Sequence, residues 1–355
     1  MKRIVLKIGS SSLFSGGEFA EEKINILARE IKALKDNGVE VCLITSGAIA
    51  LGLNEMNLDK KPTELPKKQA LAAIGQMYLM EKYEEIFARA SVKPAQILLS
   101  HEDFGNKNRV QNLNNTITAL FNYGVVPVIN ENDAISTDEI KVGDNDTLGA
   151  FVALNIGADL LVIISDVNGL YDKNPVKDPT AKLIERVEKI DKSITSLAKE
   201  PTSKVGTGGM ITKIKAAKIC TDSGIDMMII GNDKIDKIST ILDGANLGTI
   251  FHSKGKMPKS KNWILSCANV NGGILVDDGA KKALLKRSSL LSCGIIGVKG
   301  TFSHGSVVEI LDKEGVAFAK GVASFGVDTI KTLTKGENQV IVHANNIALI
   351  EDVLW

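Results

Sequence analysis

The chain has little of what marks secreted, membrane or zinc-binding proteins. Its four cysteines lie far apart and form no C-x-x-C pair: Cys42, Cys220, Cys267 and Cys293. We therefore expect neither a zinc site nor a disulfide framework, and a reducing cytoplasmic compartment fits best. No run approaches the ~18 apolar residues that span a bilayer. The N-terminal apolar run is broken by Lys7, which makes it too short for the core of a signal peptide. We expect no membrane partner.

Net charge and the common nucleotide motifs are also missing. Lys plus Arg number 43 and Asp plus Glu 42, so the formal charge is +1 and gives no general attraction to nucleic acid or membrane. The chain contains no G-x-x-x-x-G-K-[ST] and no G-x-G-x-x-G after a strand. A Walker-type site and a dinucleotide-binding Rossmann site are thereby excluded.

What is present indicates two domains. The chain has 355 residues, and this length is too great for one ordinary core. Hydrophobic residues make up 44% of it, which supports a fully globular fold. Through the first 250 residues, short β-branched runs alternate with amphipathic stretches, as in α/β proteins. The runs are nearly continuous in apolar residues, as expected of strands covered on both faces. We predict a three-layer αβα sandwich with a mainly parallel sheet and strands at Arg3–Ile8, Val39–Thr45, Ala95–Leu99, Val125–Asn130, Asp159–Ile164 and Asp226–Ile230.

After this region the pattern changes. Residues 253–262 are rich in lysine and read as an exposed linker between a domain at 1–252 and a second at 263–355. The second domain has short β-type runs separated by glycine-bearing turns, and it is predicted to be small and mostly β, with one helix near Gly279–Lys286. The predicted strands are Gly273–Val276, Ile295–Lys299, Ser306–Leu311, Val316–Ala323 and Val340–Val342.

Chemically distinctive residues follow the predicted strands. Lys7 lies at the carboxyl end of the first strand, and Ser46 and Gly47 follow the second. Ligands of open α/β sheets bind at that edge, where helix N–H groups also converge on anions. A lysine reaching past the sheet to solvent and a simple helix cap by Thr45 or Ser46 are the alternatives for these two segments.

The fourth and fifth strands are followed by polar segments as well. Asn130-Glu131-Asn132-Asp133 offers acceptors and amide donors suited to a zwitterionic ligand, or forms a solvated loop. In Asp144-Asn145-Asp146, the crowded carboxylates indicate a bound cation or a lysine partner, with helix capping as the alternative. Ser165 and Asp166 begin a polar turn of the kind that wraps a nucleotide.

A glycine-rich loop precedes a predicted helix that contains Lys213. The segment reads Gly206-Thr207-Gly208-Gly209-Met210-Ile211-Thr212-Lys213. Its glycines can bend backbone N–H groups around phosphate oxygens. A flexible linker is the alternative, although it leaves the position of the lysine unexplained.

Taken together, these motifs resemble the amino acid kinase family. The resemblance rests on Lys7 with its glycine, Ser46-Gly47, Asp144-Asn145-Asp146, Ser165-Asp166 and Gly208–Lys213. The tail is similar to a PUA domain, through Gly272–Ala280 and Ser288–Leu291. The combination implies the amino acid kinase fold followed by a PUA module. It also implies the branch of the family that transfers the ATP γ-phosphoryl group to the γ-carboxylate of L-glutamate, the first step of proline synthesis.

The resemblance also implies roles for single residues. Lys7 and Lys213 would neutralise the transferred phosphoryl group from two sides, and Asp146 would orient them. Ser46, Asp133 and Asn145 would bind glutamate, with Gly47 and Asn130 nearby. No metal ligands are expected among the side chains, since Mg²⁺ would bridge phosphate oxygens. ATP would be bound by Lys7, Ser165, Asp166, Thr207, Gly208, Gly209, Met210, Ile211, Thr212 and Lys213.

Partners and alternatives follow from the same comparison. Inhibition by proline and a homodimer or homotetramer are expected of such an enzyme. One alternative keeps the fold and changes the acceptor to N-acetylglutamate, aspartate, carbamate or a nucleoside monophosphate. The other is an RNA-binding or RNA-modifying protein acting through the PUA module. Nine basic and nine acidic residues from Trp263 onward give that module no surplus charge for RNA phosphates.

Overall fold

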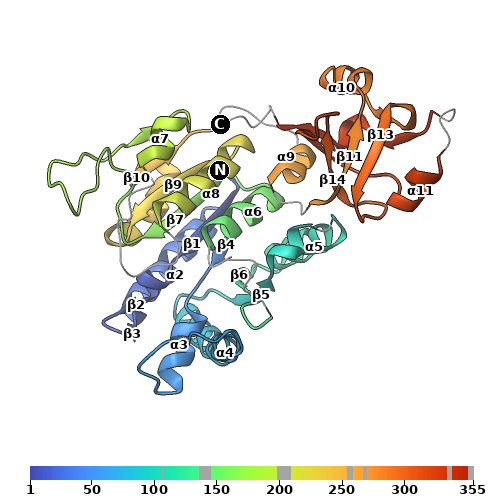
Figure 1. The fold of residues 1–355 in the computed structure, drawn as a ribbon. Helices are drawn as coiled ribbons and strands as arrows, with labels where there is room; N and C mark the ends of the chain where they lie inside the picture. Colours follow the sequence, from blue (N-terminus) through green and yellow to red (C-terminus); the bar gives the residue numbers. More distant parts are fainter. Residues whose placement is uncertain are drawn as a thin grey trace. The chain divides into compact units, whose positions relative to one another are not determined.

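The computed structural model describes residues 1–105, 107–135, 145–197, 209–253, 259–266, 270–333 and 338–350. The chain divides into two compact units, one of residues 1–101 and 112–255 and one of residues 102–111 and 256–355 (Figure 1). The second unit thus includes a segment from inside the predicted first domain. The end of the predicted linker, 259–262, also differs from expectation, because it belongs to helix α9 (Lys259–Ser266).

The first unit is built on a sheet of eight strands in the order β5-β6-β4-β1-β7-β9-β10-β8. All neighbouring strands are parallel except β9 and β10, which run antiparallel. The six predicted strands are present, and their ends are shifted by at most one residue. In chain order the strands are β1 (Arg3–Ile8), β4 (Glu40–Ile44), β5 (Pro94–Leu99), β6 (Val126–Glu131), β7 (Leu160–Ser165), β8 (Arg186–Val187), β9 (Asp226–Gly231) and β10 (Gly248–Phe251).

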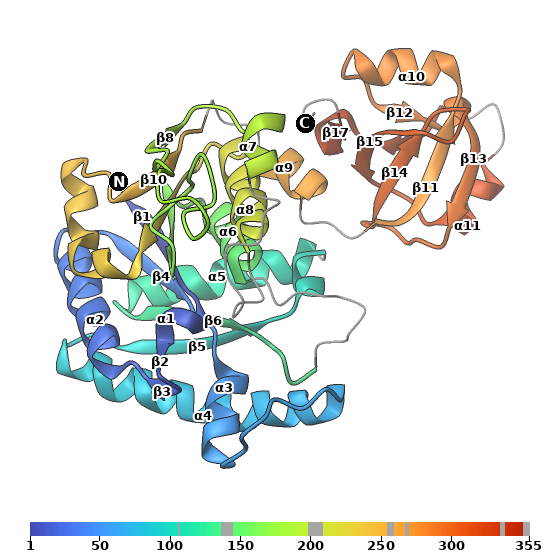
Figure 2. The same cartoon turned by 60° about the vertical axis from the view of Figure 1, so that its left-hand side comes forward.

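Helices cover both faces of this sheet, which confirms the three-layer architecture (Figure 2). One face carries α2 (Glu21–Asp36), α4 (Leu65–Arg89) and the 3-10 helix η2 (Asn232–Asp243), whose apolar residues share a core with alternate strand residues such as Ile4 and Leu6. The other face carries α6 (Asn145–Ile156) and α8 (Met210–Asp222), which pack against each other. None of the described helices is both long enough and apolar enough to cross a membrane.

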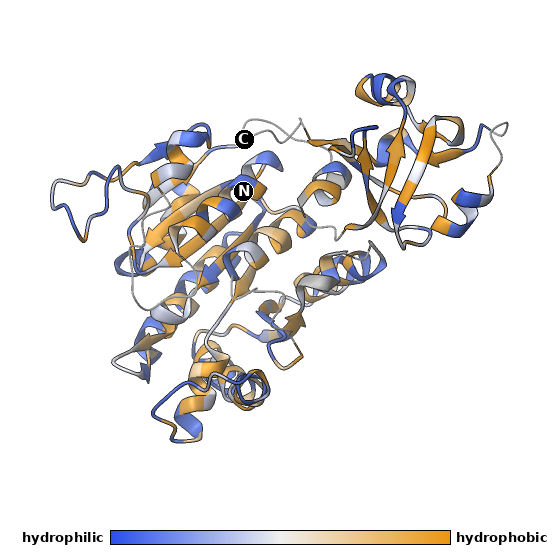
Figure 3. Ribbon diagram, in the orientation of Figure 1, coloured by the Kyte–Doolittle hydropathy of each residue, from blue (hydrophilic) through white to orange (hydrophobic). Residues whose placement is uncertain are grey.

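The strands alternate between these two faces, and this places Lys7. Successive residues of a strand point to opposite sides of the sheet. Ile4, Leu6 and Ile8 belong to the core beneath α2 and α4, so Lys7 points to the face that carries α6. Hydrophobic residues dominate the central strands (Figure 3). A lysine among them therefore needs a partner from the covering helices.

Helices α3 (Ala48–Glu55) and α4 approach each other unusually closely. A Cβ atom on Gly75 of α4 would lie 1.8 Å from the carbonyl oxygen of Ala48, and one on Gly52 of α3 would lie 2.1 Å from that of Leu71. Only glycine permits such an approach of two backbones. The contact fixes the start of α3, which immediately follows Ser46 and Gly47.

Short elements and two further helices complete the first unit. They are α1 (Ser10–Leu13), the hairpin strands β2 (Phe14–Ser15) and β3 (Glu18–Phe19), and α7 (Lys192–Leu197). Helix α5 (Lys107–Asn122) begins in the second unit and ends in the first.

The second unit contains a five-stranded sheet in the order β13-β11-β14-β15-β17 and a two-stranded sheet of β12 and β16. The predicted helix is present as α10 (Asp278–Leu285), but the unit also holds α9 and α11 (Val327–Thr332), so the prediction of one helix was wrong. Trp263 of α9 donates its indole N–H to the carbonyl of Phe104, at 2.7 Å, in the 3-10 helix η1 (His101–Gly105). The strands are β11 (Val270–Val276), β12 (Leu290–Leu291), β13 (Ile295–Gly300), β14 (Val307–Leu311), β15 (Ala317–Val322), β16 (Val340–Val342) and β17 (Ile347–Leu349), with 3-10 turns η3 (Ser292–Gly294) and η4 (Ala344–Asn346).

Candidate active site

The carboxyl ends of β1, β4, β6 and β7 lie at one edge of the parallel sheet, and the predicted site residues lie in these ends, just after them or at the starts of helices. Lys7 is the penultimate residue of β1, and Asn130 is near the end of β6. Asn145 and Asp146 begin α6, and Lys213 lies in the first turn of α8. Thr207 and Gly208 lie outside the described residues. Parallel topology thus gathers residues from six separate segments at the sheet edge where ligands bind.

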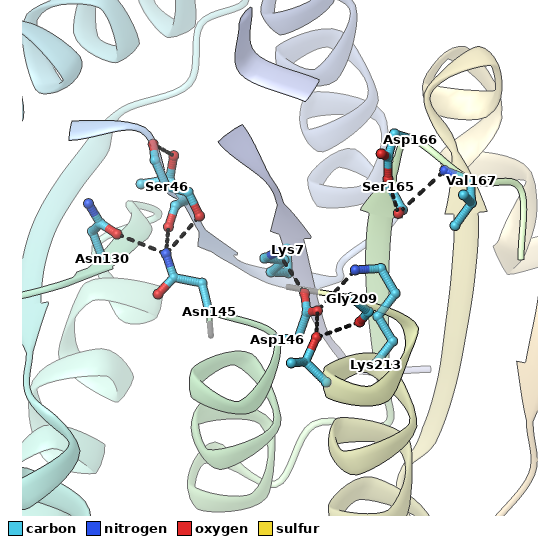
Figure 4. A network of polar contacts seen from close by, with 12 residues as sticks. Lys7, Ser46, Asn130, Asn145, Asp146, Ser165, Asp166, Val167, Gly209 and Lys213 are labelled. Atoms are coloured by element: carbon cyan, nitrogen blue, oxygen red, sulfur yellow. Dashed lines mark hydrogen bonds and ion pairs between the residues drawn. The ribbon is translucent and has the colours of Figure 1, made fainter. Parts of the chain in front are cut away.

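Two lysines share one buried carboxylate at the centre of the site (Figure 4). Lys7 Nζ lies 2.6 Å from Asp146 Oδ1, and Lys213 Nζ lies 3.0 Å from Asp146 Oδ2. Asp146 is fully buried, while Lys7 and Lys213 are 7% and 6% exposed. The two ammonium groups therefore meet on one carboxylate although they are far apart in the chain.

This arrangement determines the protonation of Asp146. Burial alone would raise the pKa of its carboxyl group, but the charges and hydrogen bonds of Lys7 and Lys213 outweigh burial and hold that pKa well below its usual range. Thr212 also donates its hydroxyl to Asp146 Oδ2, at 2.8 Å. The first turn of α8 thus contacts the carboxylate twice. With two ammonium groups and one carboxylate, the cluster has a formal charge of +1 and is suited to an anion.

A second polar cluster surrounds the side-chain amide of Asn145. Its nitrogen lies 2.7 Å from the carbonyl oxygen of Thr45, 2.7 Å from Ser46 Oγ and 3.1 Å from Asn130 Oδ1. Its oxygen is buried and has no hydrogen-bond partner among the described residues. Asn145 and Asp146 are consecutive, so this cluster directly adjoins the lysine pair (Figure 4).

Gly47 allows the loop after β4 to take its shape. Its φ is +93°, in the left-handed region that glycine favours, and it caps the N-terminus of α3. A Cβ atom there would lie 2.8 Å from the ring of Phe14. A larger residue would therefore strain the left-handed backbone here and require the Phe14 ring to move.

Asp133 lies apart from the Asn145 cluster in the contacts that the structure describes. It lines a cavity of about 450 Å³ together with Gln76 and Gln96, which is formed mainly by residues of α4, β5 and the end of β6. Burial raises the pKa of the Asp133 carboxyl, and the charge of Lys61 opposes that rise only in part. A partly buried carboxylate of this kind is suited to a cationic group of a ligand.

The residues predicted to bind nucleotide lie on the other side of the lysine pair. Ser165 donates to Asp166 Oδ1 at 3.0 Å and accepts from the backbone N–H of Val167 at 3.4 Å. A cavity of about 310 Å³ begins beyond this turn and is lined by residues 167, 169–175, 177–178, 196–197 and 210. Gly209 caps α8, Met210 lines the cavity, and Ile211 is exposed. The volume is at the lower end of those that hold small ligands.

The described residues contain no group of three or more His, Cys, Asp or Glu side chains that could hold a metal ion. Both oxygens of Asp146 already face ammonium groups. Among the described residues, the Asp146 carboxylate is therefore engaged by lysines and not placed as part of a metal centre.

Several residues around the site were not identified from the sequence. Gln76 accepts from Asn130 Nδ2 at 2.9 Å, and the hydroxyl of Tyr83 lies 2.7 Å from Thr45 Oγ1. Both side chains come from α4, seven residues apart, and therefore from one helix face. Neither residue carries a distinct signal in the sequence, because a polar side chain in the amphipathic helix α4 is expected at the surface of that helix.

Comparison with known proteins matches both parts of the chain. A model of the amino acid kinase family matches residues 2–231, and a model of the PUA domain matches residues 272–344. A glutamate 5-kinase of Caldanaerobacter subterraneus is 44% identical over 335 residues, which are 93% of this chain and 90% of that protein. A glutamate 5-kinase of Carboxydothermus hydrogenoformans is 42% identical over 99% of this chain and 98% of that protein.

The fold is shared with more distant proteins of known structure. A carbamate kinase from Giardia lamblia bound to AMP-PNP superposes with a TM-score of 0.52 at 17% identity, covering 71% of this chain and 99% of that one. At this identity the likeness concerns the fold alone. The matched family model covers well over half of the chain, and the relatives match it nearly end to end. The chain belongs to the amino acid kinase family, with a PUA domain at its C-terminal end.

Proposed function

We propose that the protein transfers the γ-phosphoryl group of ATP to the γ-carboxylate of L-glutamate and so forms L-glutamyl 5-phosphate. The observation that carries the proposal is the pair of buried ammonium groups of Lys7 and Lys213 held on Asp146. The names of relatives more than 40% identical over nearly the whole chain support the choice of acceptor.

The chemistry needs positive charge more than it needs a base. A carboxylate acceptor is already ionised at neutral pH, so no group has to remove a proton from it. The difficulty is to bring two anions together and to stabilise the charge on the transferred group in a loose transition state. Lys7 and Lys213 supply that stabilisation, and Asp146 holds their ammonium groups in place before the substrates bind.

Glutamate would be held at the Asn145 cluster. Ser46 and Asn130 fix the Asn145 amide, and its oxygen, which has no partner within the described part of the chain, would accept from the α-ammonium group. Asp133 adds a carboxylate on the same side of the site. The γ-carboxylate then extends toward Lys7, because Asn145 and Asp146 are consecutive residues.

ATP would be bound by Ser165, Asp166 and the segment from Thr207 to Lys213, with its base and ribose in the cavity lined by Tyr171 and Pro175. Mg²⁺ would be carried on the phosphate oxygens, since both oxygens of Asp146 are occupied by lysines. The ion would add to the neutralisation of the phosphate charge that the lysines provide.

Two further properties belong to the proposal. Glutamyl 5-phosphate is taken to feed proline synthesis, and proline is expected to inhibit the enzyme at or overlapping the glutamate pocket. A homodimer or homotetramer is expected, which light scattering of the purified protein tests. If physiological proline leaves the glutamate saturation curve unmoved, the expectation of feedback inhibition is wrong.

The decisive experiment measures ATP consumption with glutamate, N-acetylglutamate, aspartate and UMP, with hydroxylamine present to trap an acyl phosphate. We expect hydroxamate with glutamate alone. A matched pair of variants separates chemistry from folding: Lys213→Met removes a site ammonium group, and Lys218→Met removes a half-buried one farther along the same helix, where it pairs with Asp222. Hydroxamate with another acceptor, or full activity of Lys213→Met, would refute the proposal.

A further inference from the structure

A chain of side-chain amides runs from helix α4 to the Asn145 cluster. Asn145 Nδ2 lies 3.1 Å from Asn130 Oδ1, and Asn130 Nδ2 lies 2.9 Å from Gln76 Oε1. Gln76 Nε2 in turn lies 2.9 Å from Gln96 Oε1. Asn130 and Gln76 are 1% and 9% exposed, whereas Gln96 is exposed. Each amide donates to the oxygen of the next, so all the hydrogen bonds of this series run in one direction, from Asn145 to Gln96.

Backbone groups fix that direction. The carbonyl oxygen of Thr45 can only accept, so the group 2.7 Å from it must be the nitrogen of Asn145. The backbone N–H of Glu131 can only donate, so the Asn130 atom 2.9 Å from it must be the oxygen. Asn130 therefore donates from its nitrogen to Gln76, and Gln76 must accept with its oxygen. Flipping either asparagine would bring two acceptors or two donors together.

The consequence appears at Asn145, the other end of this series of hydrogen-bonded amides. The nitrogen of Asn145 is directed to Thr45, Ser46 and Asn130, so its oxygen is turned away from all three (Figure 4). That oxygen is buried and unpartnered among the described residues. Leaving a buried acceptor unpaired is unfavourable, so the site favours a ligand that donates there. The α-ammonium group of an amino acid is such a donor.

Helix α4 braces the same amide by a second route. The hydroxyl of Tyr83 lies 2.7 Å from Thr45 Oγ1, and both residues are fully buried. Thr45 is the residue whose carbonyl oxygen accepts from Asn145. Gln76 and Tyr83 lie two turns apart on one face of α4, so one rigid helix supports Asn145 at two points.

We infer that Gln76 is a positioning residue for the acceptor: through Asn130 it holds the Asn145 carboxamide with its oxygen toward the α-ammonium group of the substrate. This inference rests on the proposed function, since it names how that site distinguishes an amino acid from a simple dicarboxylate. Gln76 acts through Asn130, and its contribution is to the affinity for the ammonium group and not to phosphoryl transfer.

The test compares Gln76→Met with Gln76→Glu. Methionine fills a similar volume but removes the acceptor for Asn130, whereas glutamate keeps an acceptor oxygen and the exposed amide of Gln96 can turn to donate to it. We expect Gln76→Met to raise KM for glutamate about 10-fold, which corresponds to about 1.4 kcal/mol. KM for ATP should not change, and Gln76→Glu should stay within about 3-fold of the unmodified protein. Gln76→Leu replaces Gln76→Met if that variant does not fold.

Glutarate separates positioning from general damage to the pocket, because it has both carboxylates and lacks the ammonium group. Measured as a competitive inhibitor against glutamate, its Ki should be the same for the unmodified protein and for Gln76→Met. An unchanged KM for glutamate in Gln76→Met, or a Ki for glutarate that rises in parallel, would overturn the inference. Hydroxamate formation by the unmodified protein tests the proposed function independently. The proposed function and the role of Gln76 can therefore be refuted separately.

Discussion

The substitution Asp146→Asn tests the centre of the site most directly. Asparagine has nearly the shape of aspartate, so packing at this fully buried position is kept. The change removes the one negative charge that lies 2.6 Å from Lys7 Nζ and 3.0 Å from Lys213 Nζ. The formal charge of the cluster rises from +1 to +2, and two largely buried ammonium groups are left without a counterion.

The magnitude follows from burial. Breaking a buried ion pair by removing one partner typically costs ~3–5 kcal/mol of unfolding free energy. We expect the lower end of that range, because both ammonium groups retain slight access to solvent and the amide oxygen of Asn can still accept from Thr212. Turnover should fall by ~10²–10³, the usual effect of losing a preorganised electrostatic contact. ATP affinity should not fall, since a triphosphate meets more positive charge in the variant.

The assay measures kcat, KM for ATP and KM for glutamate by hydroxamate formation, together with urea denaturation. Asp222→Asn is the matched control: it makes the same substitution at the half-buried C-terminal end of α8, where the i,i+4 ion pair with Lys218 contributes about 1 kcal/mol. The reasoning is refuted if Asp146→Asn keeps kcat within about 10-fold of the unmodified protein, or if its main defect is a weaker affinity for ATP.

Three further predictions concern stability and reactivity. Gly75→Ala should lower the unfolding free energy by about 1–3 kcal/mol, because the added methyl overlaps the carbonyl oxygen 1.8 Å away in α3; a urea midpoint equal to that of the unmodified protein would contradict this. The pKa of Asp146 is lower in the folded protein than in the unfolded chain. The ionised Asp146 carboxylate therefore stabilises the fold fully at pH values above the unfolded-state pKa, and this stabilisation is lost as pH falls through the folded-state pKa. The difference in unfolding free energy between the unmodified protein and Asp146→Asn should thus be constant from about pH 7 to 5 and shrink below about pH 4. Iodoacetamide should alkylate exposed Cys293 in the native protein and reach Cys42 and Cys220 only after denaturation, since burial raises the pKa of both thiols; mass spectrometry of the peptides decides this.

The buried strands of the first unit could be predicted because their sequence carries one dominant signal. A run such as Leu160–Ser165, buried throughout on both faces, is apolar except at its last residue. Strand β10 was not predicted. It has only four residues and runs antiparallel to β9, so neither its length nor a parallel βαβ pattern identifies it.

The second unit was less predictable for a different reason. Helix α9 begins in a lysine-rich stretch with few apolar residues, and it is ordered by contacts with β15, β17 and η4 of its own unit. The hydrogen bond from Trp263 to Phe104 joins residues 159 positions apart. Tertiary contacts of this kind override local propensity, and a single sequence gives no indication of them.

The site also contains some residues that the sequence identifies and others that only the structure identifies. Lys7 and Lys213 stand out because a charged residue in an apolar strand or beside a glycine-rich loop requires a function. Gln76 does not stand out, since a glutamine in the amphipathic helix α4 is expected at its surface. Only the position of Asn130 beside it shows that this amide is part of a directed hydrogen-bond chain.

Asp146 explains how two lysines can be buried together before any substrate arrives. Two ammonium groups at close range repel each other, and each loses hydration when it is buried. A carboxylate between them offsets both effects, and it is fixed by the helix start and by Thr212, so its position does not depend on ions from solution. Under the proposed function, the unfavourable step of gathering positive charge is completed during folding. The γ-phosphate and the acceptor carboxylate then enter a site that already has its charges in place, which is where electrostatic catalysis is most effective.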